Sequence, residues 1–146
     1  MLDDWICDAV GIASLCATPT WPLAALVLRV SLGALFIAHI YWKLAIFEGG
    51  FPAWWARFGT TGYHWIVPCY VVSAEILGAT LLIPGLHTRW VSLYALPLML
   101  GATHYWQTRK GFFFTEGGSE LPLVWAMMLI LQLLLGDGAL AVGSLI

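Results

Sequence analysis

Charged side chains are scarce in this sequence. Asp, Glu, Lys and Arg make up 10% of its 146 residues, whereas soluble domains carry about 25%. So few charges cannot cover a water-facing surface, which argues against a soluble globular protein. Basic residues are also few, because six Lys and Arg stand against eight Asp and Glu. This balance argues against nucleic-acid binding through a basic patch.

Cysteine is equally sparse, with Cys7, Cys16 and Cys69 as the three positions and no C-x-x-C pair. This argues against a dithiol redox motif and against thiolate metal sites. A metal held by His39, His104 and a carboxylate has only a weak signal without a short His-x-x-His motif, so no metal centre is expected. A Cys7–Cys16 disulfide remains open, and Cys69 is interpreted as a small core residue. The sequence also has no c-type haem motif, iron–sulfur pattern or nucleotide fingerprint. If the chain moves electrons, the cofactor is either a quinone or belongs to another subunit.

What the sequence has in abundance is apolar residues, at 61%. They form four segments near the 20 or so residues that a bilayer requires. Strand alternation is absent, and backbone inside lipid must satisfy its own hydrogen bonds, so the segments are predicted to be helices. The predicted fold is an all-α membrane protein, a single domain over 1–146 with four transmembrane helices in an up-down bundle. The expected spans are 22–47, 65–83, 88–107 and 121–140.

Two further elements are predicted outside the spans. In residues 1–20, apolar positions such as Leu2, Trp5 and Ile6 recur at helical spacing opposite three aspartates, which predicts an amphipathic helix. The connection 48–64 is rich in tryptophan and predicts a half-buried interfacial helix around 51–58. Six of the nine tryptophans lie near the same membrane face. They indicate an aromatic belt, or alternatively a docking surface for a hydrophobic headgroup or partner.

The distribution of Lys and Arg predicts the topology. We call the membrane side where the first span begins side A and the opposite side B. Side A carries only Arg89 outside the spans. Because basic residues favour the cytoplasmic side, side B is predicted to face the cytoplasm and both termini to lie outside it. The basic residues of side B are Lys43, Arg57, Arg109 and Lys110.

Three polar side chains are expected at one depth inside the spans. Counting about 1.5 Å per residue from the nearest span end places Arg29, Glu75 and Gln132 in one layer. Charges in a span face the bundle interior and pair there. We therefore predict a buried ion pair between Arg29 and Glu75 with Gln132 nearby, and keep a proton relay as the alternative.

A second polar layer is expected near side B. It includes His39 and Lys43 on one helix face, with His104 at a similar depth. Glu116 and Glu120 enter it from the loop before the last span, and Trp42 and Trp106 lie beside it. Such residues can simply anchor the helices, or they can bind a quinone through donors, exchangeable protons and stacked rings. The candidate catalytic residues are His39, Lys43, His104 and Glu120, and the candidate ligand-binding residues are Trp42 and Trp106.

The sequence resembles the DoxX family of small bacterial membrane proteins over about residues 26–138. The resemblance rests on short motifs in a shared order and spacing. They are Leu28-Arg29-Val30 with Gly33, His39 and Lys43, then Glu75-Ile76-Leu77-Gly78, Gly85 to Arg89, Met99 to His104, Gly111-Phe112, Gly117 to Glu120 and Gly136-Asp137-Gly138.

The resemblance implies a multi-pass protein of the bacterial inner membrane. Relatives include the quinone-reducing subunit of a thiosulfate:quinone oxidoreductase and proteins associated with thiol or oxidative stress. The expected function is a subunit of a quinone- or thiol-linked redox complex, with a hydrophobic-ligand site near His39 and His104. Its expected partners are the lipid bilayer, other membrane subunits and a quinone or similar molecule. The alternative is a non-catalytic subunit that binds and stabilises a larger membrane complex.

Overall fold

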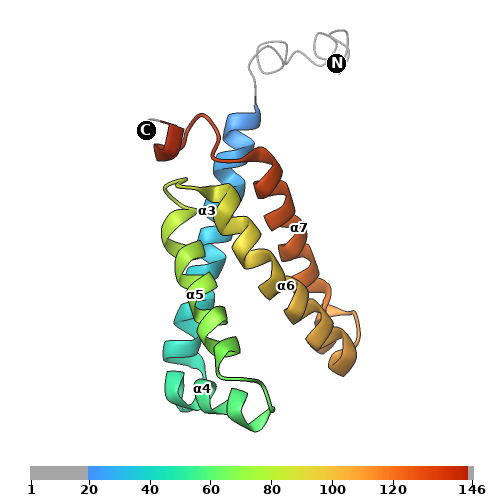
Figure 1. Cartoon of the computed structure of the whole chain (residues 1–146). Coiled ribbons are helices and arrows are strands. Elements are labelled where there is room, and N and C mark those ends of the chain that lie inside the picture. Colours follow the sequence, from blue (N-terminus) through green and yellow to red (C-terminus); the bar gives the residue numbers. More distant parts are fainter. Residues whose placement is uncertain (1–19, 145–146) are drawn as a thin grey trace.

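Five α-helices make up most of the chain in the computed structural model, which describes residues 20–144 (Figure 1). They are α3 (Trp21–Tyr41), α4 (Gly50–Thr60), α5 (Ile66–Leu81), α6 (Thr88–Lys110) and α7 (Glu120–Leu135). A π-helical turn, η1 (Trp42–Ile46), continues α3, and short 3-10 helices lie at η2 (Phe114–Glu116) and η3 (Val142–Ser144). Residues 20–144 contain no strand, which confirms the all-α prediction for that range.

Two predictions fall on residues outside the described range. The amphipathic helix expected over residues 1–20 lies there almost entirely, as does the possible pairing of Cys7 with Cys16. Cys69, by contrast, is described: it is a free thiol in α5 and is half-buried.

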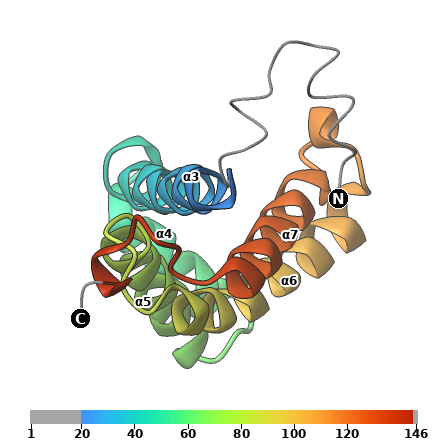
Figure 2. The same cartoon turned by 90° about the horizontal axis from the view of Figure 1, so that it is seen from above.

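The four long helices alternate in direction along the chain (Figure 1). α3 and α6 begin at one end of the molecule, and α5 and α7 finish there; we call this end A, and it corresponds to side A of the sequence prediction. α4 lies at the opposite end, which we call end B. α3 packs against α5 and α6 packs against α7, and the two pairs diverge toward end B (Figures 1 and 2).

An apolar core occupies the middle of the bundle, and all four long helices or their ends contribute to it. Two glycines allow α3 and α5 to come close there. A methyl group on Gly33 would lie 2.5 Å from Ile83 Cγ1, and one on Gly78 would lie 2.3 Å from Phe36 Cδ2. Small residues of this kind let the backbones of neighbouring membrane helices approach closely. The buried core residues are Leu32, Phe36, Leu82, Val91, Ala95, Met99, Trp125, Ala126 and Leu129.

Among the described residues 20–144, one helix is long and apolar enough to cross a membrane, namely Trp21–Ile46 through α3 and η1. α5 and α7 are apolar but have 16 residues each. Large apolar side chains also point outward from the long helices, as with Val27, Trp90 and Leu134, which are 57%, 70% and 70% exposed. Apolar side chains exposed around a helix bundle are typical of a lipid-facing surface.

Candidate functional site

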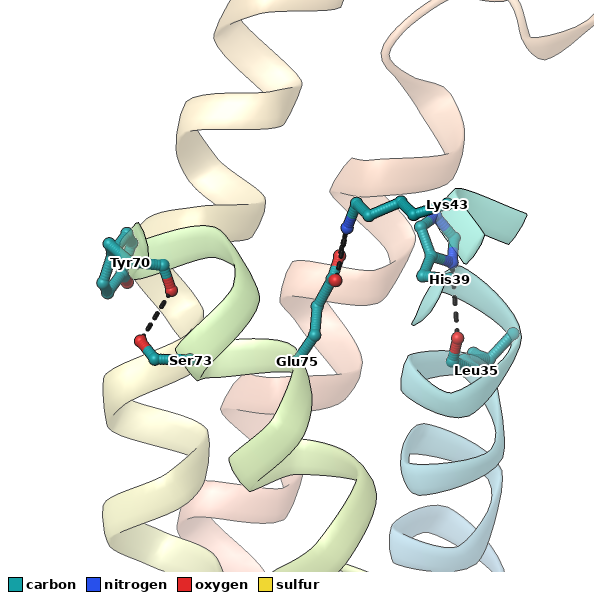
Figure 3. A network of polar contacts seen from close by, with 6 residues as sticks. All are labelled: Leu35, His39, Lys43, Tyr70, Ser73 and Glu75. Carbon is teal, nitrogen blue, oxygen red and sulfur yellow. Dashed lines mark hydrogen bonds and ion pairs between the residues drawn. The ribbon is translucent and has the colours of Figure 1, made fainter. Parts of the chain in front are cut away.

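The most unusual polar feature of the structure is a buried ion pair between Lys43 and Glu75 (Figure 3). Lys43 lies in the π-helical turn η1, and Glu75 lies in the middle of α5. The side chains are 6% and 4% exposed, and Lys43 Nζ donates to both carboxylate oxygens of Glu75. A charge pair in an apolar helix bundle is costly to desolvate, and single π turns in α-helices are frequent at functional sites. The pair is therefore the first candidate for function.

An aromatic ring covers the lysine end of this pair. Trp54 of α4 places its ring 4.6 Å from Lys43 Nζ, a cation–π contact, and is itself 7% exposed. Because α4 lies at end B, Trp54 covers the ion pair on that side. A helix predicted around residues 51–58 is thus present as α4, and it contributes Trp54 to the site.

His39 lies one helical turn before Lys43 on the same face of α3. Its Nδ1 is 3.3 Å from the carbonyl oxygen of Leu35 (Figure 3). A carbonyl oxygen only accepts, so Nδ1 carries the proton in this bond and Nε2 remains an acceptor in the neutral ring. The imidazole packs edge-on against Trp125 of α7, with ring centroids 4.7 Å apart.

Trp125 is buried and has an unusual property. Its Nε1 has no hydrogen-bond partner among the residues that the structure describes, although buried indole N–H groups usually find one. The ring also packs on Phe36, with centroids 5.1 Å apart. A buried, unpartnered donor on a ring that packs against His39 is the kind of group that a bound acceptor would satisfy.

The predicted ion pair between Arg29 and Glu75 is wrong, although both side chains are buried, at 2% and 3% exposure. Arg29 Nη2 donates to the carbonyl of Leu140 at 2.5 Å. Nη1 lies 3.4 Å from the carbonyls of Pro84 and Asp137. Arg29 therefore ties the turn between α5 and α6 to the segment that follows α7.

The helix register explains this error. The prediction measured depth from Pro22 and Pro84 as though α3 and α5 ended at the same level. In the structure Gly33 lies against Ile83, so α3 extends well beyond α5 at end A (Figure 1). A methyl group on Gly85 would lie 1.5 Å from Arg29 Nη1. Arg29 is thus level with the α5–α6 turn, and Glu75 lies nearer end B, where Lys43 reaches it.

Gln132 belongs to the network of Arg29 at end A. It is fully buried, and its Nε2 donates to Gly136 O at 2.7 Å and to Thr88 Oγ1 at 3.3 Å. The backbone N–H of Thr88 donates to Asp137 Oδ1 at 2.7 Å, and the Asp137 carbonyl accepts from Arg29. Gln132 and Arg29 are thus linked through Thr88 and Asp137, in a network that closes the loops of end A.

His104 and Trp106 are not brought to the ion pair. Both are exposed in the last turns of α6, and that end of α6 lies away from α3 in both views (Figures 1 and 2). The predicted convergence of His39 with His104 relied on equal depth alone. The divergence of the α6–α7 pair from the α3–α5 pair separates the two helix ends sideways.

Trp42 and Glu120 also have other neighbours. Trp42 is 41% exposed and packs edge-on against Phe47, with centroids 5.1 Å apart. Glu120, at the start of α7, accepts a hydrogen bond of 3.0 Å from the backbone N–H of Phe114. Of the six candidate catalytic and ligand-binding residues, His39 and Lys43 share the buried site.

Sequence reasoning missed the positions of Trp54 and Trp125, which it counted among the six tryptophans near side B without distinguishing them from Trp42, Trp55, Trp65 and Trp106. The available signal was periodicity, because Trp54 lies in a short amphipathic segment whose apolar face must cover something. No sequence signal distinguished Trp125 from the other tryptophans near side B.

The arrangement combines donors, exchangeable protons and flat rings in an apolar setting. Lys43 and Trp125 can donate hydrogen bonds, Glu75 and His39 can exchange protons, and Trp54 and Trp125 offer ring surfaces. Within residues 20–144 no group of three His, Cys, Asp or Glu side chains is placed to hold a metal ion. The donors of this arrangement are of a kind that can hydrogen-bond to acceptor oxygens.

The comparisons with known proteins agree with the resemblance seen in the sequence. A family model described as DoxX matches residues 24–116, which include Arg29, His39, Lys43 and Glu75 and cover more than half of the chain. No curated protein and no solved structure matches the chain. The chain therefore belongs to the DoxX family and is a small membrane protein of that family.

Proposed function

We propose that this protein is a four-helix inner-membrane subunit of a redox complex, in which the Lys43–Glu75 site binds the head group of a quinone or similar lipid-soluble ligand. The observation that carries the proposal is the burial of a full ion pair among apolar helices. A second observation supports it: the buried, unpartnered Nε1 of Trp125 belongs to a ring that packs against His39. Ionisable residues inside membrane segments generally mark pathways or binding sites.

The residues at the site fit a quinone head group. Its two carbonyl oxygens need donors, which Lys43 and Trp125 Nε1 supply. Its flat ring needs aromatic neighbours, which Trp54 and Trp125 supply. A bound quinone accepts two electrons and two protons, and the groups of this chain that can hold or release protons there are Glu75, His39 and Lys43. The electrons would come from a partner subunit.

The proposal includes the membrane arrangement. α3 with η1, α5, α6 and α7 each cross the bilayer, and α4 lies in the interface at end B. Lys43 is paired inside the bundle, so it no longer counts as a surface charge. Arg57, Arg109 and Lys110 still outnumber Arg89, which keeps end B in the cytoplasm and both termini outside it.

The alternative function is a non-catalytic subunit that stabilises a larger membrane complex. One observation favours it: Lys43 and Glu75 neutralise each other and already share two hydrogen bonds, so the pair can serve as an interhelix link without any ligand. In this case the exposed aromatic residues of end B, such as Trp55 and Trp65, would contact the partner.

Gentle purification separates the two functions. The protein is isolated in a mild detergent, extracted with organic solvent and analysed by mass spectrometry, in parallel with the double variant Lys43→Met/Glu75→Gln. The redox proposal expects a quinone in the wild-type extract and its loss from the variant. Stoichiometric larger subunits without any quinone, in both samples, would favour the structural alternative.

A further inference from the structure

We propose that water and protons reach the Lys43–Glu75 pair from end B only, by way of Trp54 and α4, and that the bundle is closed between the pair and end A. This inference concerns access to the ion pair and goes beyond the proposed function, because it holds whether or not a quinone binds there.

An apolar layer separates the pair from end A. Along α3, Leu32 and Phe36 lie between Arg29 and Lys43, and both are fully buried. Beyond α5, Leu82 lies between Glu75 and the Pro84 turn and is also fully buried. α6 and α7 complete the layer with Val91, Ala95, Met99, Trp125, Ala126 and Leu129, all of them 6% exposed or less. Close-packed apolar side chains leave no path for water.

Hydrogen bonds to backbone carbonyls form a second barrier at end A. Arg29 holds the Leu140 carbonyl and approaches that of Pro84. Val142 N donates to Pro84 O at 3.0 Å, and Gly143 N donates to Gly85 O at 3.3 Å. The segment after α7 is thereby fastened over the α5–α6 turn. The apolar layer therefore separates Arg29 and the fastened segments of end A from the Lys43–Glu75 pair.

The cover at end B is much thinner. The ring of Trp54 lies over Lys43 Nζ, while the outer side of α4 is exposed, as at Trp55 and Thr60. Gly49 (φ 81°), just before α4, and Gly50 (φ 64°), its first residue, adopt left-handed conformations that are readily available to glycine. A displacement of α4 at this joint uncovers Lys43 without disturbing the contacts between α3 and α5.

One-sided access determines which compartment exchanges protons with the site. His39 is the titratable group beside the pair on α3, and it lies on the end-B side of Phe36. Any proton that Glu75, Lys43 or His39 gains or loses therefore exchanges with the end-B solution. If end B faces the cytoplasm, that compartment supplies the protons.

Cysteine accessibility tests this inference. Cys7, Cys16 and Cys69 are first replaced, and Glu75→Cys is introduced together with Lys43→Met so that no lone charge stays buried. A membrane-impermeant methanethiosulfonate is then added to one side of oriented vesicles at a time, because thiol modification requires thiolate in contact with water. We expect modification from end B, acceleration severalfold by Trp54→Ala, and no acceleration by the matched Trp55→Ala.

Three single-cysteine controls calibrate the assay. Leu140→Cys, 56% exposed at end A, should react from that side, and Thr60→Cys should react from end B. Leu82→Cys, fully buried in the apolar layer, should react from neither. His39→Cys, which keeps the ion pair, repeats the measurement if the Glu75 variant does not fold. Modification of position 75 or 39 from end A would overturn the inference, as would inert thiols at both positions after Trp54→Ala.

Discussion

The ring of Phe36 in α3 lies directly against Gly78 in α5, so that a methyl group on this glycine would lie 2.3 Å from Phe36 Cδ2. This contact and the one between Gly33 and Ile83 fix the register of the two antiparallel helices. The register in turn decides which charges meet: Glu75 meets Lys43, and Arg29 meets the turn at end A.

Gly78→Val is therefore expected to destabilise the protein. The added side chain overlaps Phe36, and overpacking a core typically costs about 1–3 kcal/mol. Thermal unfolding in detergent micelles should show a lower midpoint. The matched control is Gly101→Ala in α6, where a methyl group would meet no atom within 4 Å. That control should unfold at or slightly above the wild-type midpoint, since alanine favours helix, and an equal loss in both variants would refute the register argument.

Replacing one member of the Lys43–Glu75 pair should destabilise the protein more than replacing both. Lys43→Met or Glu75→Gln leaves the other group buried without its partner, which costs about 3–5 kcal/mol, whereas replacing both charges by neutral side chains is far less harmful. Unfolding of the two single variants and the double variant gives the coupling energy as a double-mutant cycle. Additive losses would contradict the pairing.

Arg29→Met should loosen the C-terminal segment while leaving the core in place. The guanidinium of Arg29 holds the carbonyl of Leu140 and lies near that of Pro84. Without it, the hydrogen bonds from Val142 and Gly143 to the α5–α6 turn should open more often. Hydrogen exchange is expected to speed up at Val142 and Gly143 and to stay slow at Leu129 in the core. Arg57→Met, at an exposed position in α4, is the control. Unchanged exchange at residues 142–143 would show that Arg29 is not the fastening group.

The topology can be tested with a reporter fused after Ile146 that is active only in the cytoplasm. Because three basic residues near end B stand against Arg89 near end A, the fusion should be silent and a fusion after Thr60 should be active. Both fusions must be present at equal levels on a blot. The reverse pattern would place end A in the cytoplasm.

Local sequence patterns predicted the helices well. The partners at the site were predicted wrongly because they depend on the register between helices that are distant in the sequence. Apolar runs and the glycines and prolines between them indicated the segments that became α3, α5, α6 and α7, and the Trp-rich stretch indicated α4. Depth counting failed for Arg29 and Glu75 because it ignores how far one helix slides along another. The same limit hid the partner of Lys43, which was predicted to belong to the polar layer near side B and which the structure pairs with Glu75.

The convergence of His39 and His104 failed for a related reason. Equal depth says nothing about sideways distance, and the divergence of the two helix pairs toward end B depends on packing that no single segment encodes. Trp125 was likewise one of several tryptophans near one membrane face, and only the fold places it against His39.

Equilibrium binding of ubiquinone-1 to the protein in lipid nanodiscs is the most direct test of the proposed ligand site. We predict that the wild type binds and that Lys43→Met/Glu75→Gln weakens binding by at least about tenfold, equivalent to about 1.4 kcal/mol. His104→Ala, on the diverging end of α6, should bind as the wild type does. Unchanged binding by the double variant, or a comparable loss in His104→Ala, would contradict the assignment of the site to Lys43 and Glu75.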